Sequence, residues 1–141
     1  MSVSITVVAP AAPEAVWERW TDFARWPDWN PECLEASLDG PLAPGTTLDL
    51  HLRHPRGRDF YTRPRITNVE PEREIVWEAR GLGLRAPTRT ALSPEPDGTR
   101  VTIDAHARGP MAFTYRMSVT DRTQALIYVA MLDALSSSVR A

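Results

Sequence analysis

The hydrophobic residues of the chain follow two different spacings, and the change between them separates a strand-rich region from a terminal helix. From Leu34 to Ala107 they mostly alternate with polar residues, which is typical of antiparallel strands with one wet face. In the segment Val119–Ala141 the apolar residues recur at helical spacing, in a row made of Ala125, Tyr128, Leu132, Leu135 and Val139. This segment contains no Pro and no Gly, so it predicts one long C-terminal helix.

The residues before the alternating region predict one strand and a short helical region. Ser2–Ala9 alternates and is rich in β-branched residues, which indicates a first strand. Pro13 suits the first turn of a helix that should end near Asp22. The aromatic connection Phe23–Pro31 follows, with room for one more helical turn.

The region in between predicts about six further strands. One of them is Phe60–Val69, where Pro64 argues for an edge position or a bulge because proline cannot donate to a ladder. Ser93–Gly98 is the strongest turn signal in the chain. The order predicts an α+β fold in a single domain over residues 1–141. In it, a curved antiparallel sheet of about seven strands wraps around the C-terminal helix, with short helices after the first strand.

Several stretches of the chain, taken together, resemble a known superfamily. They are Ala9–Trp17, Phe23–Pro31, Ile66–Trp77 and Pro96–Thr102, in this order and spanning nearly the whole chain. The chain is similar to the helix-grip superfamily of START-like, polyketide cyclase/dehydrase and pollen-allergen-type domains. The resemblance implies a seven-stranded sheet around the C-terminal helix, enclosing a mostly apolar cavity. It is specific for a fold and not for an activity, because such domains include aromatase/cyclases, lipid and hormone carriers and proteins of other roles.

The strand faces and the helix stripe predict which side chains would line such a cavity. Small residues across a gap between sheet and helix produce either a close-packed core or a hole, and the resemblance favours the hole. The predicted lining from the strands is Leu34, Leu50, Thr62, Ile66, Trp77, Thr88, Thr90, Ile103 and Ala105. The helix adds Tyr128, Met131 and Leu132, and Tyr115 before the helix is a candidate for gating the far mouth or for anchoring the helix start.

Trp29-Asn30-Pro31 is a match to a motif that often closes the pocket mouth in such domains. We therefore include Trp29 and Asn30 among the predicted ligand-binding residues. The alternative, which we favour, is a structural corner, because Pro and Asn are ordinary turn residues.

Tyr61, Arg63 and Arg65 are the candidate catalytic residues. They share one face of their strand, where an inward Arg would stabilise an enolate and an inward Tyr would pass a proton. The alternative is a solvated face with cross-strand charge pairs, and we favour it because Ile66 has the opposite parity and Arg is rarely buried unpaired. A bulge at Pro64 would reverse this parity.

The sequence offers no motif for a metal or a nucleotide cofactor. His51, His54 and His106 lie in different segments, and Gly81-Leu82-Gly83 lacks the third Gly of a dinucleotide fingerprint. The net charge of −2 gives no field that attracts nucleic acid, and no apolar run is long enough to span a bilayer. The N-terminus lacks the features of a signal peptide, and a single cysteine, Cys33, fits a reducing compartment, so we expect a cytoplasmic protein.

Two function classes remain from the sequence. The first is a cyclase or dehydratase that folds a polyketide-like or other apolar, oxygenated substrate in a shaped cavity. The second is a non-catalytic carrier of a hydrophobic small molecule, which the absence of an unmistakable acid–base pair supports. A protein-interaction module is a third, weaker class. Ala125–Leu132 is apolar on every side, which predicts that its outer face is covered by other elements or by a second copy in a homodimer.

Overall fold

The computed structural model describes residues 2–53, 59–81, 84–107 and 121–139. The N-terminal elements are β1 (Ser2–Ala9), α1 (Pro13–Thr21), the 3-10 helix η1 (Phe23–Arg25) and α2 (Trp26–Trp29). Seven strands follow, namely β2 (Cys33–Leu38), β3 (Leu48–Leu52), β4 (Phe60–Thr62), β5 (Arg65–Glu70), β6 (Glu74–Gly81), β7 (Leu84–Glu95) and β8 (Gly98–His106). The chain then forms α4 (Asp121–Ser138). The predicted order of strand, short helices, strands and long helix is therefore confirmed.

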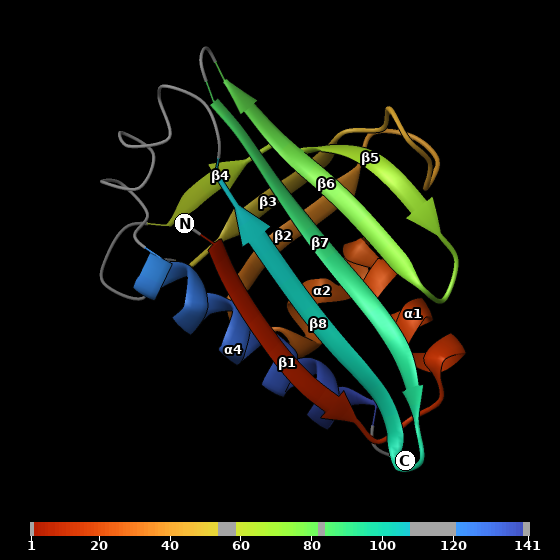
Figure 1. Cartoon of the computed structure of the whole chain (residues 1–141). Coiled ribbons are helices and arrows are strands. Elements are labelled where there is room, and N and C mark those ends of the chain that lie inside the picture. Colours follow the sequence, from red (N-terminus) through yellow and green to blue (C-terminus); the bar gives the residue numbers. More distant parts are fainter. Residues whose placement is uncertain (1, 54–58, 82–83, 108–120, 140–141) are drawn as a thin grey trace.

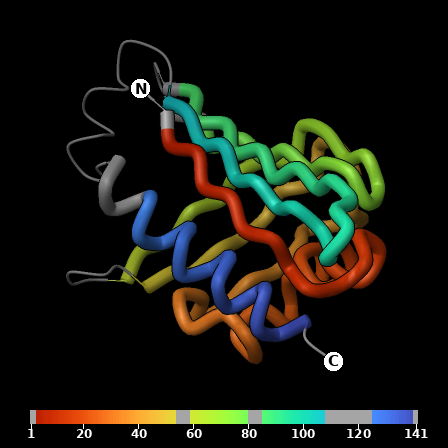
Figure 2. The backbone as a smooth tube through the Cα atoms, turned by 60° about the horizontal axis from the view of Figure 1, so that its bottom comes forward, coloured from red at the N-terminus to blue at the C-terminus, as the bar shows by residue number. Residues whose placement is uncertain are grey.

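The strands form one curved antiparallel layer that has two hydrogen-bonded parts (Figure 1). The larger part has five strands in the order β1-β8-β7-β6-β5, and the smaller has three in the order β2-β3-β4. A bridge between Thr47 and Arg65 joins the parts, together with a hydrogen bond of 2.8 Å from the Leu48 N–H to the Pro64 carbonyl oxygen. The short helices α1, η1 and α2 lie on the same side of the sheet as α4 (Figure 2).

Pro64 accounts for the difference between the seven predicted strands and the eight observed. It divides the predicted strand Phe60–Val69 into β4 and β5. The register does not shift at this point, because Leu50 pairs with Thr62 and Thr47 pairs with Arg65 in the same progression. Pro64 therefore interrupts the ladder without a bulge, and the inward and outward faces of the strand stay the same on both of its sides.

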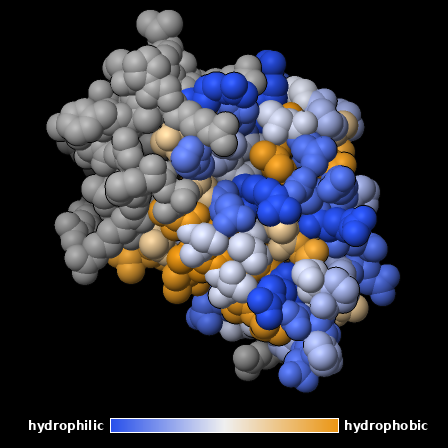
Figure 3. Space-filling view, viewed as in Figure 1, coloured by the Kyte–Doolittle hydropathy of each residue, from blue (hydrophilic) through white to orange (hydrophobic). Residues whose placement is uncertain are grey.

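Helix α4 crosses the concave face of the sheet and runs beside β1 (Figures 1 and 2). The side chains that it buries most completely are those of Ile127, Met131, Leu132 and Leu135. Leu126 and Val129 are 51% and 49% exposed, so the described elements leave part of the outer face of the helix uncovered, and its cover by a second copy of the chain stays a prediction. Hydrophobic colour is visible over this part of the molecule, whereas the outer face of β6, β7 and β8 is largely hydrophilic (Figure 3).

An aromatic cluster closes the space beneath one end of the sheet. The ring of Trp26 lies 4.7 Å from that of Trp20 and 5.0 Å from that of Phe23, measured between centroids. Trp77 of β6 completes the cluster, with its ring 5.8 Å from Phe23. The indole N–H of Trp26 donates to the carbonyl oxygen of Trp20 at 2.8 Å, which satisfies a buried donor and ties α2 to α1. Packed aromatic groups of this kind contribute beyond their buried area, so the cluster fixes the short helices against the sheet.

Gly98, at the start of β8, is required by its close approach to the end of β1. Its φ of 146° is unfavourable for other residues, and a Cβ at this position would lie 2.0 Å from the Ala9 carbonyl oxygen. We predict that Gly98→Ala lowers the free energy of unfolding by roughly 1–3 kcal/mol, measured by urea denaturation. Gly45→Ala is the matched control, because Gly45 has a φ of 99° but open space around it. Equal losses in the two variants would show that the contact with Ala9 contributes nothing.

Candidate functional site

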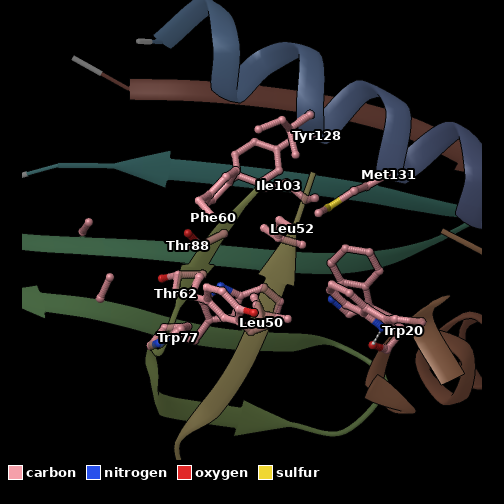
Figure 4. Close-up of a pocket in the computed structure, with 16 residues that line it drawn as sticks. Trp20, Leu50, Leu52, Phe60, Thr62, Trp77, Thr88, Ile103, Tyr128 and Met131 are labelled. Atoms are coloured by element: carbon pink, nitrogen blue, oxygen red, sulfur yellow. Dashed lines mark hydrogen bonds between the residues drawn. The ribbon is translucent and has the colours of Figure 1, made fainter. Parts of the chain in front are cut away.

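The site is a cavity between the concave face of the sheet and helix α4. Its volume is about 380 Å³. Side chains from the small helices, the strands and α4 converge on it, as the close-up shows (Figure 4). The residues around it are Trp20, Trp26, Leu50, Leu52, Phe60, Tyr61, Thr62, Pro64, Trp77, Ala79, Ala86, Thr88, Ile103, Ile127, Tyr128 and Met131.

The alternation of β3 and β4 builds one wall of the cavity. Leu50 pairs with Thr62 and Leu52 pairs with Phe60, so these four side chains share the inward face. Trp77 pairs with Thr88 between β6 and β7, which places both on the inward face of the larger part. In Figure 4, Thr62 and Thr88 lie toward one end of the cavity, and Trp20 lies at the other. Ile127, Tyr128 and Met131 cover the cavity from α4 because they stand one turn apart or less on the same helix face.

The polar side chains around the cavity are hydroxyl groups and indole N–H groups. Thr62, Thr88 and Tyr128 supply the hydroxyls, and no charged side chain is present in the described part of the lining. Such a site can hydrogen-bond carbonyl and hydroxyl oxygens, but it would leave an ionised ligand without a counter-charge. The arrangement therefore suits a neutral, mostly apolar molecule with a few oxygen atoms.

Seven of the predicted ligand-binding residues lie in the cavity wall. They are Leu50, Thr62, Trp77, Thr88, Ile103, Tyr128 and Met131. Four of the others lie outside the cavity wall. Thr90 and Leu132 are buried in the core without lining the cavity, and Tyr115 is outside the described residues.

Trp29 and Asn30 form a corner in the structure. Trp29 packs on the aromatic cluster, 5.8 Å from the ring of Trp26. Asn30 is fully buried, and its side-chain oxygen accepts a hydrogen bond of 3.0 Å from the Glu32 N–H. Neither residue lines the cavity, so their geometry is that of the structural corner.

The predicted catalytic residues lie on the outer face of their strand. Arg63 forms a salt bridge with Asp49, and Arg65 is exposed. Tyr61 is 75% exposed, and its ring stacks on that of His51 at 4.0 Å. The inward orientation on which their chemistry depended is absent, because Pro64 does not shift the register. Tyr61 nevertheless borders the cavity, although its ring lies on the opposite face of the strand.

Sequence reasoning missed several lining residues for three different reasons. Leu52, Phe60, Pro64 and Ala79 share strand parity with predicted residues, so the alternation by itself could have found them. Trp20 and Trp26 come from the short helices, whose position beneath the sheet no local pattern gives. Ile127 lies one helical turn before Met131 and also lines the cavity, but the predicted apolar row of the helix did not include it.

Metal and thiol chemistry find little support at this site. No group of three or more His, Cys, Asp or Glu that could hold a metal ion occurs among the residues that the structure describes. Cys33 is 4% exposed, and desolvation by burial raises the pKa of its thiol from 9.0 to about 11. A thiol with this pKa is overwhelmingly neutral near pH 7, so Cys33 is a packed residue and not a nucleophile.

We predict that native Cys33 reacts with a disulfide reagent at pH 8 at least about a hundredfold more slowly than in the urea-unfolded chain, because both burial and the raised pKa suppress the thiolate. The same shift makes stability pH-dependent. The thiol stays neutral in the folded state while the unfolded thiol ionises, so the free energy of unfolding should fall as the pH rises from 9.0 to about 11. The Cys33→Ala variant should lack this part of the slope. Equal labelling rates for native and unfolded chains would contradict the burial of Cys33.

Comparison with known proteins shows how widely this architecture is shared. A family model described as "Polyketide cyclase / dehydrase and lipid transport" matches residues 1–140. No curated protein matches the sequence.

Three solved structures illustrate the likeness. The di-domain ARO/CYC BexL from the BE-7585A biosynthetic pathway is 19% identical with a TM-score of 0.81, over 100% of this chain and 50% of its own. The di-domain ARO/CYC StfQ from the steffimycin biosynthetic pathway is 13% identical with a TM-score of 0.76, over 96% of this chain and 49% of its own. A START superfamily protein from Mycobacterium smegmatis is 19% identical with a TM-score of 0.75, over 98% of this chain and 96% of its own. The chain thus spans about half the length of the two di-domain proteins. At these identities the likeness establishes the helix-grip fold.

Proposed function

The chain belongs to the polyketide cyclase / dehydrase and lipid transport family, and from this premise we propose that it binds a neutral, oxygenated, largely apolar molecule in its cavity and promotes its cyclisation or dehydration. The observation that carries the proposal is the cavity of about 380 Å³ with no charged side chain in its described lining. Ligand pockets are typically 300–1,000 Å³ and apolar, with few polar groups.

The size of the cavity bounds the ligand. An engineered apolar cavity of about 150 Å³ holds one benzene molecule, so this one has room for roughly two to three fused rings. Trp20 and Trp77 offer aromatic faces, and Thr62 and Thr88 offer hydroxyls at one end. These groups favour a flat, partly aromatic skeleton whose oxygen atoms are grouped near one end.

Positioning would supply most of the catalysis. In an aldol-type cyclisation, a CH₂ carbon beside a carbonyl attacks a second carbonyl of the same molecule, and loss of one water then gives the unsaturated ring, without any oxidant. Holding the two carbons in contact converts a rare conformation into the bound one. The hydroxyls of Thr62 and Thr88 line the cavity and could hydrogen-bond the carbonyl oxygen as charge develops on it.

The alternative is a carrier that binds such a molecule without changing it. It is favoured by the absence, from the described lining, of any carboxylate, imidazole or amine that would titrate near pH 7. The two functions share the cavity and its ligand class, and they differ in whether the mass of the ligand changes during incubation.

Filling the cavity tests the proposal directly. Ala86 of β7 lines the cavity, so Ala86→Leu should weaken binding of a tricyclic aromatic ketone by about tenfold or more. Binding is followed by tryptophan fluorescence, because Trp20, Trp26 and Trp77 all border the cavity. Ala91→Leu, on the opposite face of the same strand, is the matched control and should bind like the wild type.

The thermal stability of Ala86→Leu separates a true hole from a close-packed core. A hole accepts the added carbons without loss, whereas a packed core loses roughly 1–3 kcal/mol through overpacking. A destabilised variant, together with a wild type that takes up no aromatic ligand, would exclude the proposed function.

The Arg63 side chain gives a further test. Its guanidinium lies on the outer face and pairs with Asp49, so Arg63→Ala should leave ligand binding and any turnover within about twofold of the wild type. Mass spectrometry of the incubated ligand provides the readout. A tenfold loss of turnover with unchanged stability would restore the inward role for this residue.

Partners and location are predictions that extend the proposal. We expect no nucleic acid partner, a cytoplasmic location, and a homodimer that would cover the exposed Leu126 and Val129 of α4. No helix in the described ranges has both the length and the apolar character to cross a membrane.

A further inference from the structure

In the part of the chain that the structure describes, Tyr61 of β4 lies between a paired strand on one side and a gap in the sheet on the other. On one side, Phe60, Tyr61 and Thr62 pair with β3. On the other side, the neighbour would be β6, but β5 pairs with β6 only from Arg65, opposite Glu78, onward. Ala79, the next residue of β6, pairs with Ala86 of β7 and with no strand on its other side in the part that the structure describes. Figure 1 shows β6 and β7 continuing past the end of β5 toward their hairpin.

The hydrogen-bond pattern of the ladder shows which backbone groups face this gap. The Leu48 N–H donates to the Pro64 carbonyl oxygen at 2.8 Å, so this pair belongs to the hydrogen-bonded type. In an antiparallel ladder the two types alternate, which makes the pair of Leu50 with Thr62 hydrogen-bonded and the pair of His51 with Tyr61 non-hydrogen-bonded. The N–H and C=O of Tyr61 therefore point away from β3 and toward β6.

The ring contact on the outer face supports this assignment independently. Side chains lie closer in non-hydrogen-bonded pairs, and the rings of His51 and Tyr61 are stacked with centroids 4.0 Å apart and planes at 14°. The stack also holds the Tyr61 side chain on the outer face, opposite to the cavity. Since Tyr61 nevertheless borders the cavity, its main chain is the part that does so.

The two main-chain groups of Tyr61 are available to a ligand. No hydrogen bond joins its N–H or its C=O to another described residue outside the β3 pairing. Ala79, across the gap, also lines the cavity and has the smallest chiral side chain, so a flat ligand can approach the edge of β4. An exposed strand edge presents a row of backbone N–H and C=O groups, and proteins use such edges to bind other molecules.

We propose that the main chain of Tyr61 is the polar recognition element of the cavity, with its N–H donating to a ligand carbonyl oxygen and its C=O accepting from a neighbouring ligand hydroxyl. The ligand class is then a neutral aromatic ketone, favoured further where a hydroxyl stands beside the carbonyl. The inference rests on the proposed function, because it assumes an aromatic ligand in the cavity. It assigns to Tyr61 a role that belongs to its backbone and not to its phenol.

Two ligands of the same skeleton isolate the contribution of the carbonyl. 9-Fluorenone and fluorene have the same three rings, and only fluorenone carries an acceptor oxygen. We expect the wild type to bind fluorenone roughly tenfold more tightly than fluorene, by tryptophan fluorescence titration, as one good hydrogen bond allows.

Two variants at one position isolate the N–H. Tyr61→Pro removes the N–H, and proline is tolerated here because this N–H is not part of the ladder to β3. Tyr61→Ala removes the same ring but keeps the N–H. The preference for fluorenone should be lost in Tyr61→Pro and retained in Tyr61→Ala.

The outcomes distinguish the two proposals. Binding of neither ligand by the wild type would overturn the proposed function. Equal binding of both ligands, or a preference that survives in Tyr61→Pro, would overturn the role of Tyr61 while leaving the cavity function in place. If Tyr61→Pro does not fold, the amide resonance of Tyr61 in the ¹⁵N-labelled wild type decides. A downfield shift of its proton with fluorenone but not with fluorene supports the inference, and the same shift with both, or with neither, overturns it.

Discussion

The register between β3 and the broken strand β4–β5 is the constraint on which the site depends. It is held on both sides of Pro64, through the pairing of Leu50 with Thr62 and of Thr47 with Arg65. Because side chains alternate strictly along a strand, a shift of one residue would bring Arg63 and Arg65 into the cavity and expel Thr62. The unshifted register instead keeps the guanidinium groups in water, where Arg63 pairs with Asp49. The neutral character of the cavity thus follows from backbone pairing as much as from residue choice.

The same proline also opens the sheet. It supplies a carbonyl oxygen to Leu48 but has no N–H to return, and the strand stops being a continuous edge for β6 beyond this point. Among the described residues, the β5–β6 ladder therefore stops at Arg65, and the cavity wall beyond it includes Tyr61 and two small residues, Ala79 and Ala86. On the proposal made for Tyr61, a cavity that is apolar elsewhere would gain its polar specificity at this point of the sheet.

The aromatic cluster sets the other end of the cavity. Trp20 and Trp26 come from the short helices between the first two strands, and Trp77 comes from β6, so residues distant in sequence meet there. Large rigid rings fill space with little conformational freedom, which gives the cavity a firm base. A binding site that is shaped by rigid rings and capped by α4 suits catalysis by positioning, and it suits carriage equally well. The membership of the family is compatible with both, since its description includes cyclisation, dehydration and lipid transport.

The sequence by itself determined the order of the elements, the α+β class and the inward faces of the strands, because alternation and helical spacing are local properties of the chain. It therefore placed Leu50, Thr62, Trp77, Thr88 and Tyr128 in the cavity wall. Only the tertiary structure decided what depends on distant contacts. It showed that Pro64 keeps the register, that Trp29 and Asn30 form a corner, and that Trp20 and Trp26 reach the cavity. It also turned Tyr61 from a candidate phenol into a candidate backbone donor, because the direction of an N–H is set by the neighbouring strand and leaves no trace in the identity of the side chain.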